Sequence, residues 1–186
     1  FMHTVNSELI GNLSNLFNRT LSLLWKNLNG KLKIDFDLNL NESDKDMINE
    51  IKNVTIILAD LYSKVELREV YKKIMEFSST GNVYIDRCAP WKLIKDGNLE
   101  DFKKVMYIML NVCRTLCIIS YPIIPKSILK VWKDQLNLPD NPGDSEIWSK
   151  AGDLEIPSNY SIFQPKPLFE RIDNEIRQQT IEIVPN

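Results

Sequence analysis

The sequence predicts an all-α protein, built as an antiparallel helical bundle that ends in a C-terminal arm and a short helix. Apolar residues recur at helical spacing over most of the chain, and its 186 residues include only 6 glycines. Most of the 9 prolines lie after residue 120, and beyond Leu138 the helical pattern gives way to a turn-rich link with Pro139, Pro142 and Gly143. We therefore assign residues 1–150 to the helical bundle and residues 151–186 to the C-terminal arm and helix.

The first helix is expected from about Val5 to Asn29, and Gly30 ends it. Its apolar side is formed by Leu9, Leu13, Leu16, Phe17, Thr20 and Leu24. Its polar side is formed by Glu8, Asn15, Arg19, Ser22 and Lys26. Such an amphipathic pattern is typical of a helix that packs one face on a core. A short extended or loop passage is expected at residues 35–40.

The second helix is expected at about residues 43–63, and acidic residues mark its start. Asp44 and Asp46 suit the positive end of the helix dipole. Glu100 and Asp101 form a similar pair further along the chain. We interpret both pairs as solvated charges at helix starts, and assign them no catalytic role.

The remaining helices follow from apolar spacing and from glycine and proline positions. The third is expected at residues 66–80, and Gly81 either ends it or lies within a continuation to Asp86. The next long helix, at residues 99–120, is the most apolar, so we expect it at the centre of the bundle. Two further helices are expected at residues 126–136 and 168–179.

Ala89-Pro90-Trp91 lies between two helical stretches and is the most informative motif of the chain. Proline is well suited to the first turn of a helix, and Gly97 is well placed to end that helix. A large ring on such a rigid corner suits stacking against a nucleic-acid base. A packed helix junction is the other interpretation, because tryptophan is highly buried on average.

The polar face of the first helix offers a second candidate site. Asn15 and Arg19 are four residues apart and project side by side. An amide beside a guanidinium supplies several donors and an acceptor, which match the edge of an unstacked base. Lys26, Lys31 and Lys33 follow and suit contact with a phosphate backbone. Ordinary solvated surface residues are the alternative interpretation of these groups.

Composition limits the classes of function. The chain is 44% hydrophobic and 26% charged, as is ordinary for a globular domain. A net charge of −2 argues against a broadly basic, sequence-blind nucleic-acid binder, and leaves a binder that reads a few bases. No apolar run reaches membrane-spanning length and no signal peptide is evident, so we expect a cytoplasmic protein without a membrane partner. The chain starts within an apolar-rich stretch, which suggests part of a longer polypeptide.

Catalytic and metal-binding groups are missing from the pattern. Cys88, Cys113 and Cys117 form no Cys-x-x-Cys pair, and the single His3 is distant in sequence. We therefore expect reduced, buried thiols and no zinc site. The sequence has no glycine-rich phosphate loop, and one histidine at the start of the chain supports no nucleophile set. No catalytic residue is assigned.

Several motifs occur in an order found in a known family. They are Asn12-Leu13-x-Asn15-Leu16-x-x-Arg19 with Asn29-Gly30-Lys31; Asn82-x-Tyr84-Ile85-x-x-x-Ala89-Pro90-Trp91-Lys92-Leu93; Pro122-Ile123-Ile124-Pro125; and Phe163-Gln164-Pro165-Lys166-Pro167-Leu168-Phe169-x-Arg171-Ile172. Together they resemble the anticodon-binding domain of methionyl-tRNA synthetase, a class I aminoacyl-tRNA synthetase. The resemblance implies the helical bundle of that class.

The resemblance also implies roles for particular residues. The enzyme joins methionine to tRNA using ATP, and its helical domain reads the CAU anticodon. Trp91, supported by Pro90, would stack on the first anticodon base, a cytosine. Asn15 and Arg19 would contact the same region. The partners would be the anticodon stem-loop of tRNA(Met) and the enzyme's own catalytic domain.

The family's catalytic signatures, of the His-Ile-Gly-His and Lys-Met-Ser-Lys types, do not occur in this sequence, and neither do its zinc-knuckle cysteines. The resemblance therefore implies a C-terminal part of the enzyme without ligase activity of its own. ATP binding, and any zinc site, would lie in the catalytic part. The last helix would return towards that part, with Leu168, Phe169 and Ile172 facing a missing partner surface.

Two other functions stay open at this point. One is an anticodon-binding domain of another class I synthetase, of the leucine, isoleucine, valine or cysteine type. The other is a helical protein-interaction module. A stacking role for Trp91 requires at least one ring face open to solvent without RNA, whereas a packed corner requires both faces to be buried.

Overall fold

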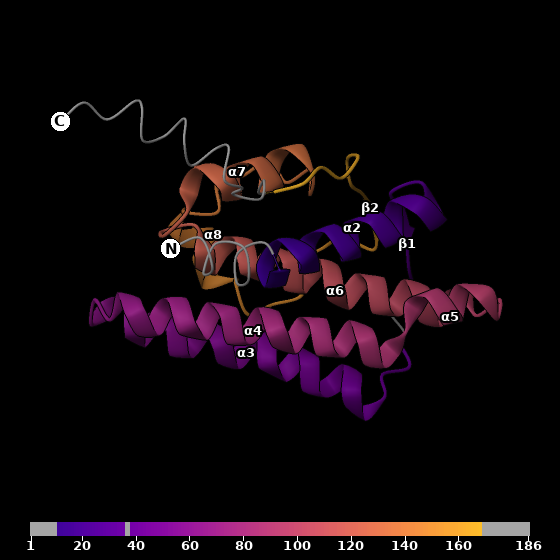
Figure 1. Cartoon of the computed structure of the whole chain (residues 1–186), viewed down its shortest axis with the longest axis horizontal. Coiled ribbons are helices and arrows are strands. Elements are labelled where there is room, and N and C mark those ends of the chain that lie inside the picture. The colour runs from indigo at the N-terminus through magenta and orange to yellow at the C-terminus, as the bar shows by residue number, and fades with distance from the viewer. Residues whose placement is uncertain (1–10, 36–37, 169–186) are drawn as a thin grey trace, which may run out of the picture.

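The computed structural model describes residues 11–35 and 38–168 of the chain. Helices dominate these residues, and two short strands pair beside them (Figure 1). In chain order the elements are α2 (Asn15–Leu28), β1 (Lys31–Lys33), α3 (Glu42–Ser63), α4 (Leu67–Cys88), α5 (Pro90–Lys95), α6 (Leu99–Ser120), α7 (Pro125–Asp134), α8 (Ser145–Ser149) and β2 (Asn159–Ser161). The predicted all-α class and helical bundle are confirmed, and the small sheet is an addition to them.

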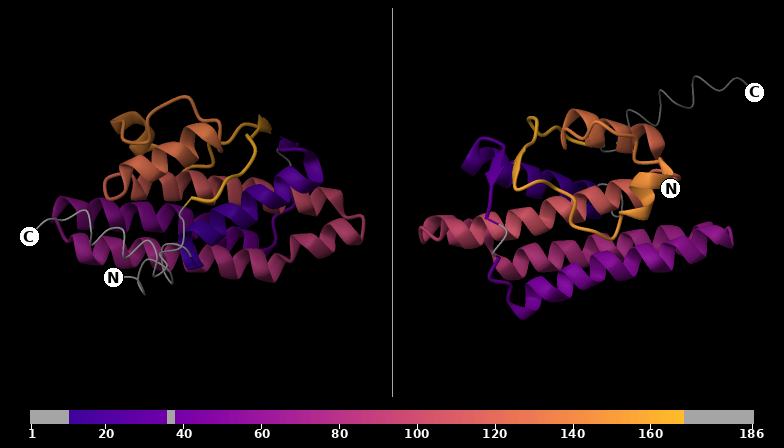
Figure 2. Two further views of the ribbon diagram at one scale, coloured as in Figure 1. Left: turned by 45° about the horizontal axis from the view of Figure 1, so that its top comes forward. Right: turned by 180° about the vertical axis from the view of Figure 1, so that it is seen from behind.

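Helix α6 forms the centre of the fold, as its apolar composition predicts. Every residue from Lys104 to Ser120 is buried, and α6 contacts α2, α3, α4, α5 and α7. Figure 1 shows α3 and α4 side by side in one layer, with α6 and α2 next to it and α7 on the far side; Figure 2 shows the same order from behind. A helix enclosed in this way needs apolar residues all round.

The start of α3 corrects one prediction. Asn41 and Asp44 form a capping box, in which the backbone N–H of each donates to the side chain of the other at 3.0 Å. The Asp44 side chain is fully buried, so its interpretation as a solvated charge is wrong. Burial is tolerated because the carboxylate also accepts a hydrogen bond from Tyr84 and pairs with Lys104. Asp46 is exposed, as predicted.

Helix α4 continues through Gly81 to Cys88, which decides between the two predicted ends. Gly81 is buried where α4 crosses α2, and a Cβ atom there would lie 2.9 Å from Leu16 Cδ2. The glycine therefore allows the close approach of the two helices. As a result, the next residue, Asn82, comes within reach of the polar side chains of α2.

A two-stranded antiparallel sheet joins the arm to the bundle. β1 pairs with β2 in the register Lys31↔Ser161, Leu32↔Tyr160 and Lys33↔Asn159. Ile34 N–H extends the pairing by donating to Ser158 O at 2.9 Å. The predicted extended passage at residues 35–40 begins just after this strand. Strands of three residues, far apart in sequence, give no recognisable period, so their pairing was not predicted.

The described part of the arm packs on α6. Thr115 Oγ1 donates to Ala151 O at 2.7 Å, and Ile156 N–H donates to Asn111 Oδ1 at 3.2 Å. Ala151 and Ile156 are fully or almost fully buried. Helix α8 lies in the stretch predicted as a turn-rich link. The predicted helix at 168–179 lies outside the described residues except for its first residue, so its return towards a catalytic domain stays a prediction.

The first helix is described from residue 11, where a π-helical turn over residues 11–14 leads into α2. Asn29 ends it in the left-handed conformation, with φ of 53°. The predicted residues 5–10 of this helix lie outside the described part of the chain, as does His3.

Two of the three cysteines are buried and all three are free thiols. Burial raises the pKa of Cys113 to about 12 and that of Cys117 well above its usual value, so both are unreactive in ordinary conditions. Cys88 is half-buried.

Over residues 11–35 and 38–168 there is no group of three or more potential metal-ligating acids, cysteines or histidines. Nor does any helix in that part have the length and apolar character to cross a membrane.

Candidate nucleic-acid interface

The corner at Ala89-Pro90-Trp91 is rigid because two helices share one residue. Ala89 ends α4, with its N–H donating to Ile85 O at 3.0 Å, and also begins α5 in the left-handed conformation, with φ of 44°. Pro90 is the buried first residue of α5, where its missing N–H costs nothing. Trp91 follows and leaves 43% of its surface exposed. Trp91 is therefore not enclosed in the core, which a packed corner with both ring faces buried would require.

Arg19 of α2 lies over the indole of Trp91. Its guanidinium carbon is 5.8 Å from the ring centroid, which is within the range of a cation–π contact. The sequence predicted both side chains as site residues, but their spacing gave no indication that they meet. The structure brings them together because α5 packs against α2.

Two residues of α4 hold the Arg19 side chain in place. Arg19 donates one hydrogen bond to Asp86 Oδ1 at 2.5 Å and another to Asn82 Oδ1 at 3.3 Å. These two contacts use two of its five N–H groups. Asn82 and Asp86 are four residues apart on one face of α4, a spacing that predicts neighbouring side chains. The sequence predicts neither residue as part of the site, because nothing in α4 itself indicates that α2 faces them.

Asn82 is itself fixed by a set of amide contacts. Its Nδ2 donates to the Asn12 backbone oxygen at 3.3 Å, to Asn12 Oδ1 at 3.2 Å and to Ser78 O at 3.2 Å. Asn12 in turn donates to Met75 O and Ser79 Oγ, both at 2.9 Å. With its Nδ2 occupied in this way, Asn82 presents its Oδ1 as an acceptor to Arg19 of α2.

Asn15 lies at the solvent edge of this cluster. It is exposed, and its Nδ2 is 3.5 Å from Asn82 Oδ1, which is the weakest contact of the set. Asn12 is half-buried and turned towards α4, so the two nearby asparagines have different environments. Of the pair, Asn15 is the one whose amide is accessible beside Arg19.

We call Asn15, Arg19, Asn82, Asp86 and Trp91 the Arg19–Trp91 cluster. It places an exposed indole, a guanidinium and two amides within one surface. An indole stacks on any planar base, and the guanidinium and amides provide directed hydrogen bonds. Such an arrangement suits one unstacked base whose edge presents acceptors.

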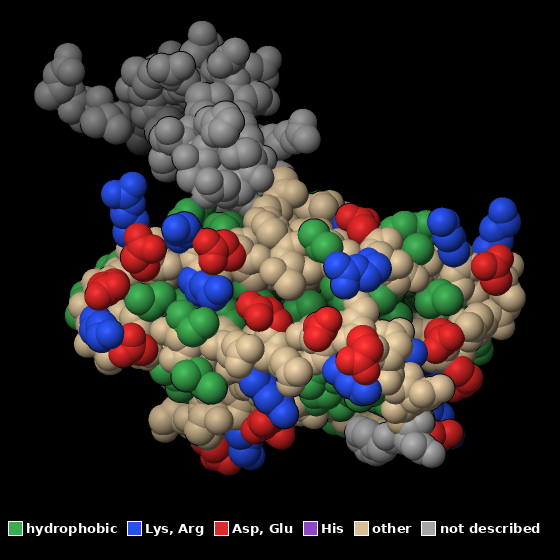
Figure 3. Space-filling view, turned by 90° about the horizontal axis from the view of Figure 1, so that it is seen from below, with side chains coloured by type: hydrophobic (Ala, Val, Ile, Leu, Met, Phe, Trp, Pro, Cys, Tyr) green, Lys and Arg blue, Asp and Glu red, His purple; other side chains and the backbone are tan. Residues whose placement is uncertain are grey.

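Charge around the molecule is mixed. Figure 3 shows Lys or Arg and Asp or Glu side chains interspersed over the face that it presents. Lys26, Lys31 and Lys33 are exposed, as required for a contact with phosphate, and Lys92 and Lys95 of α5 are exposed next to Trp91. The net charge of −2 fits a site that depends on placed side chains more than on a broad positive field.

Comparison with known proteins decides the family. The family model for the anticodon binding domain of methionyl tRNA ligase matches residues 37–182. The chain belongs to this family. The resemblance seen in the sequence motifs is thereby confirmed, and an anticodon domain of another class I synthetase is not favoured.

Relatives of known sequence agree with this family. The methionine–tRNA ligase of Sulfurisphaera tokodaii is 33% identical over 189 residues, which cover 100% of this chain and 32% of the relative. The methionine–tRNA ligase of Protochlamydia amoebophila is 32% identical, over 97% of this chain and 26% of the relative. The chain thus spans about a third or less of the length of these relatives.

Solved structures show the same fold. The free-state methionyl-tRNA synthetase of Mycobacterium tuberculosis matches with a TM-score of 0.82 over 92% of this chain and 34% of that chain, at 20% sequence identity. A second structure of that protein, in complex with methionyl-adenylate, gives a TM-score of 0.80. The chain therefore has the helical architecture expected of the anticodon-binding domain family.

Proposed function

We propose that this chain reads the CAU anticodon of tRNA(Met) as the C-terminal part of a methionyl-tRNA synthetase. The observation that carries the proposal is the Arg19–Trp91 contact at an exposed corner, in a chain of the anticodon-binding family. The roles of Asn15, Arg19, Pro90 and Trp91 are part of this proposal.

Trp91 provides the stacking surface. A base stacked on an aromatic side chain contributes about 1–3 kcal/mol to binding, with little dependence on which base it is. Pro90 keeps the ring at the corner because its φ is fixed and its own side chain is buried. Affinity for the first anticodon base therefore comes largely from this residue.

Arg19 and Asn15 provide the choice of base. The pairing edge of cytosine presents two adjacent acceptors, N3 and O2, and a guanidinium donates to such a pair with charge-assisted bonds. Uracil carries an N–H at position 3, which faces the same donors without an acceptor. Asn82 and Asp86 hold Arg19 before RNA arrives, so less side-chain freedom is lost on binding.

The rest of the enzyme belongs to the same proposal. The catalytic domain would bind ATP and methionine, carry any zinc site and contact this chain, while this chain alone would have no ligase activity. The setting would be cytoplasmic protein synthesis. Leu168 packs against the bundle core, and we propose that the segment after it returns to the catalytic domain.

Binding of anticodon stem-loops tests the proposal and its alternatives. We expect the chain to bind a CAU stem-loop about 5- to 150-fold more tightly than one with UAU, since a lost bidentate contact costs about 1–3 kcal/mol. Preference for another triplet would support a different class I synthetase. Binding without dependence on the anticodon, or no binding, would leave a protein-interaction module as the better explanation.

Catalysis by the full-length enzyme gives an independent test. Trp91→Ala should lower the rate of tRNA charging and leave methionine activation with ATP unchanged, because activation does not involve the anticodon. Phe163→Ala is a matched control, since Phe163 is a similarly exposed aromatic residue of the arm, outside the cluster. Equal loss of charging and activation in Trp91→Ala would show a folding defect and would reject the stacking role.

A further inference from the structure

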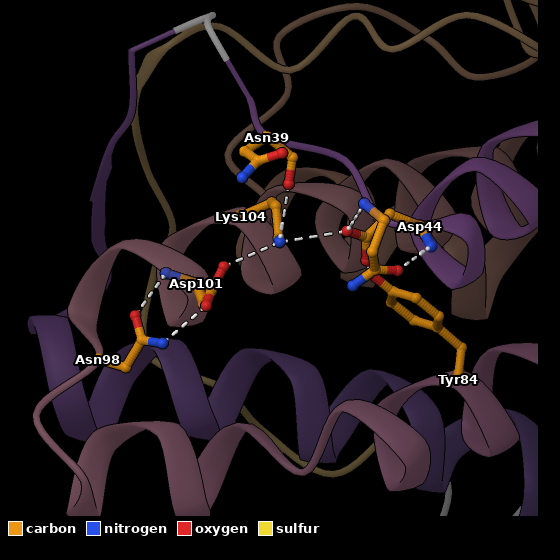
Figure 4. A network of polar contacts seen from close by, with 7 residues as sticks. Asn39, Asp44, Tyr84, Asn98, Asp101 and Lys104 are labelled. Carbon is orange, nitrogen blue, oxygen red and sulfur yellow. Dashed lines mark hydrogen bonds and ion pairs between the residues drawn. The ribbon is translucent and has the colours of Figure 1, made fainter.

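A buried cation lies behind the Arg19–Trp91 cluster. Lys104 of α6 exposes only 9% of its side chain, and its Nζ contacts Asp101 Oδ1 at 2.8 Å, Asn39 O at 3.1 Å and Asp44 Oδ2 at 3.2 Å (Figure 4). Three acceptors match the three donors of an ammonium group. We call these residues, together with Tyr84 and Asn98, the Lys104 network.

The charge on Lys104 is stable in this setting. Burial lowers the pKa of its ammonium, but hydrogen bonds and charge from Asp101 and Asp44 outweigh that effect and raise the pKa overall. The same contact lowers the pKa of Asp101, with a further contribution from Asn98. Lys104 and Asp101 are therefore ionised together over the neutral range.

One arm of the network reaches the end of α4. Tyr84 donates its hydroxyl to Asp44 Oδ1 at 2.8 Å, and that carboxylate pairs with Lys104 through its other oxygen. Tyr84 lies between Asn82 and Asp86 in sequence, about 200° away from each around the helix. The hydrogen bond thus sets the rotation of α4 from the side opposite to the one that holds Arg19.

The other arm reaches the far end of α5. Asn98 lies just beyond the end of α5, after Asp96 and Gly97, and caps the start of α6. Its Oδ1 accepts from Asp101 N–H at 3.2 Å, and its Nδ2 donates to Asp101 Oδ2 at 2.6 Å. The other oxygen of Asp101 accepts from Lys104. Since α5 is a short helix between Ala89 and Asn98, both of its ends are connected to the same ammonium group.

We infer that Lys104 is a positioning residue for base stacking: it fixes both ends of the corner that carries Trp91, and so sets the indole against Arg19. This inference rests on the proposed function. Lys104 is too buried to contact RNA itself, so its effect on RNA binding must pass through Trp91 and its neighbours. Loss of Lys104 leaves the buried Asp44 without its cation, and the ends of α4 and α6 shift to hydrate it.

A double-mutant cycle on the chain tests the inference, with a CAU anticodon stem-loop as the probe. Lys104→Met should weaken binding about fivefold or more in the wild-type background, and should have little further effect in a Trp91→Ala background. Equal weakening in both backgrounds would overturn the inference, because it would reveal a general structural role. Unchanged affinity in a folded Lys104→Met variant would overturn it as well.

If Lys104→Met does not fold, a milder variant provides the test. Tyr84→Phe removes only the hydroxyl that binds Asp44, and the same cycle with Trp91→Ala should again show coupling. Tyr107→Phe is the matched control: Tyr107 is also buried, but donates its hydroxyl to Leu154 O in the arm. Equal effects of the two tyrosine variants, or none from Tyr84→Phe, would reject the inference.

Binding of the CAU stem-loop by the wild-type chain tests the proposed function separately from the positioning role of Lys104. Absence of CAU-dependent binding by the wild type removes both proposals. Binding that depends on Trp91 but is not coupled to Lys104 or Tyr84 leaves the proposed function intact and removes only the positioning role.

Discussion

The Arg19–Trp91 cluster and the Lys104 network use the same chemistry at opposite degrees of burial. Each joins a cation to a carboxylate and to an asparagine. At the surface, the side chains of Arg19 and Asp86 are 26% and 61% exposed. In the interior, those of Lys104 and Asp44 are 9% and 0% exposed. The two regions are joined by the last turns of α4.

The difference in burial implies a division of tasks. An exposed ion pair contributes about 0–1 kcal/mol to stability, so its loss is expected to change the free energy of unfolding little. Removing one partner of a buried pair costs about 3–5 kcal/mol, because the remaining charge is left unpaired. The buried network is therefore suited to hold the helices, whereas the exposed cluster contributes little to stability and is accessible to RNA.

Removal of the buried cation should produce the largest change in stability. Lys104→Met is expected to lower the free energy of unfolding by about 3–5 kcal/mol and the Tm by roughly 10 °C, since Asp44 is left buried and unpaired. Urea denaturation followed by circular dichroism measures the change. A loss below about 1 kcal/mol would show that water or a rearranged partner reaches Asp44.

Removal of the surface cation should affect binding more than folding. Arg19→Ala is expected to weaken the affinity for a CAU stem-loop by about 10- to 100-fold, as a charge-assisted hydrogen bond contributes about 1.5–3 kcal/mol. Fluorescence anisotropy with labelled RNA measures it. Lys130→Ala, on α7, is a suitable control cation. An unchanged RNA affinity of Arg19→Ala would show that the cluster only packs the surface of the fold and does not contact the RNA.

Neutralising the exposed partner should have a small effect on stability. Asp86→Asn is expected to change the free energy of unfolding by less than about 1 kcal/mol, because more than half of its side chain is in water. Denaturation of this variant beside Lys104→Met gives the contrast directly. Similar losses for the two variants would contradict the division between the regions.

The smallest expected effect is a change in the free energy of unfolding at acidic pH. The pKa of Asp101 is lowered in the folded chain by Lys104 and Asn98, relative to an ordinary value of 3.8. The contribution of ionised Asp101 to the free energy of unfolding is therefore present above its ordinary pKa and is lost as the pH falls through its pKa in the folded chain. We expect the stability advantage of wild type over Asp101→Asn to narrow as the pH falls below about 4. A difference in stability between the two proteins that does not change with pH would show that the charge of Asp101 does not contribute to stability.

The sequence predicts the long helices well because they are periodic, whereas the five-residue helix α8 was not predicted. Apolar spacing located α6 at the centre, and its burial is confirmed. The sheet escaped prediction because its strands are too short to show a pattern. Asp44 was misread because acids at a helix start are usually solvated; only the positions of Tyr84 and Lys104 in space reveal why this one is buried.

The candidate site was only partly predictable for the same reason. Spacing of four residues placed Asn15 beside Arg19 on one helix. It could not show that α5 packs against α2, which sets Trp91 against Arg19, or that Asn82 and Asp86 face the same guanidinium. Contacts between helices depend on packing distances such as the close approach at Gly81, which a single helix pattern does not contain.

The most direct test of base stacking by Trp91 is the affinity of folded Trp91→Ala for a CAU anticodon stem-loop. We expect a loss of about 1–3 kcal/mol, or roughly 5- to 150-fold, with circular dichroism unchanged. A folded variant that binds the stem-loop as tightly as the wild type would contradict the stacking role, because the exposed indole would then take no part in reading RNA.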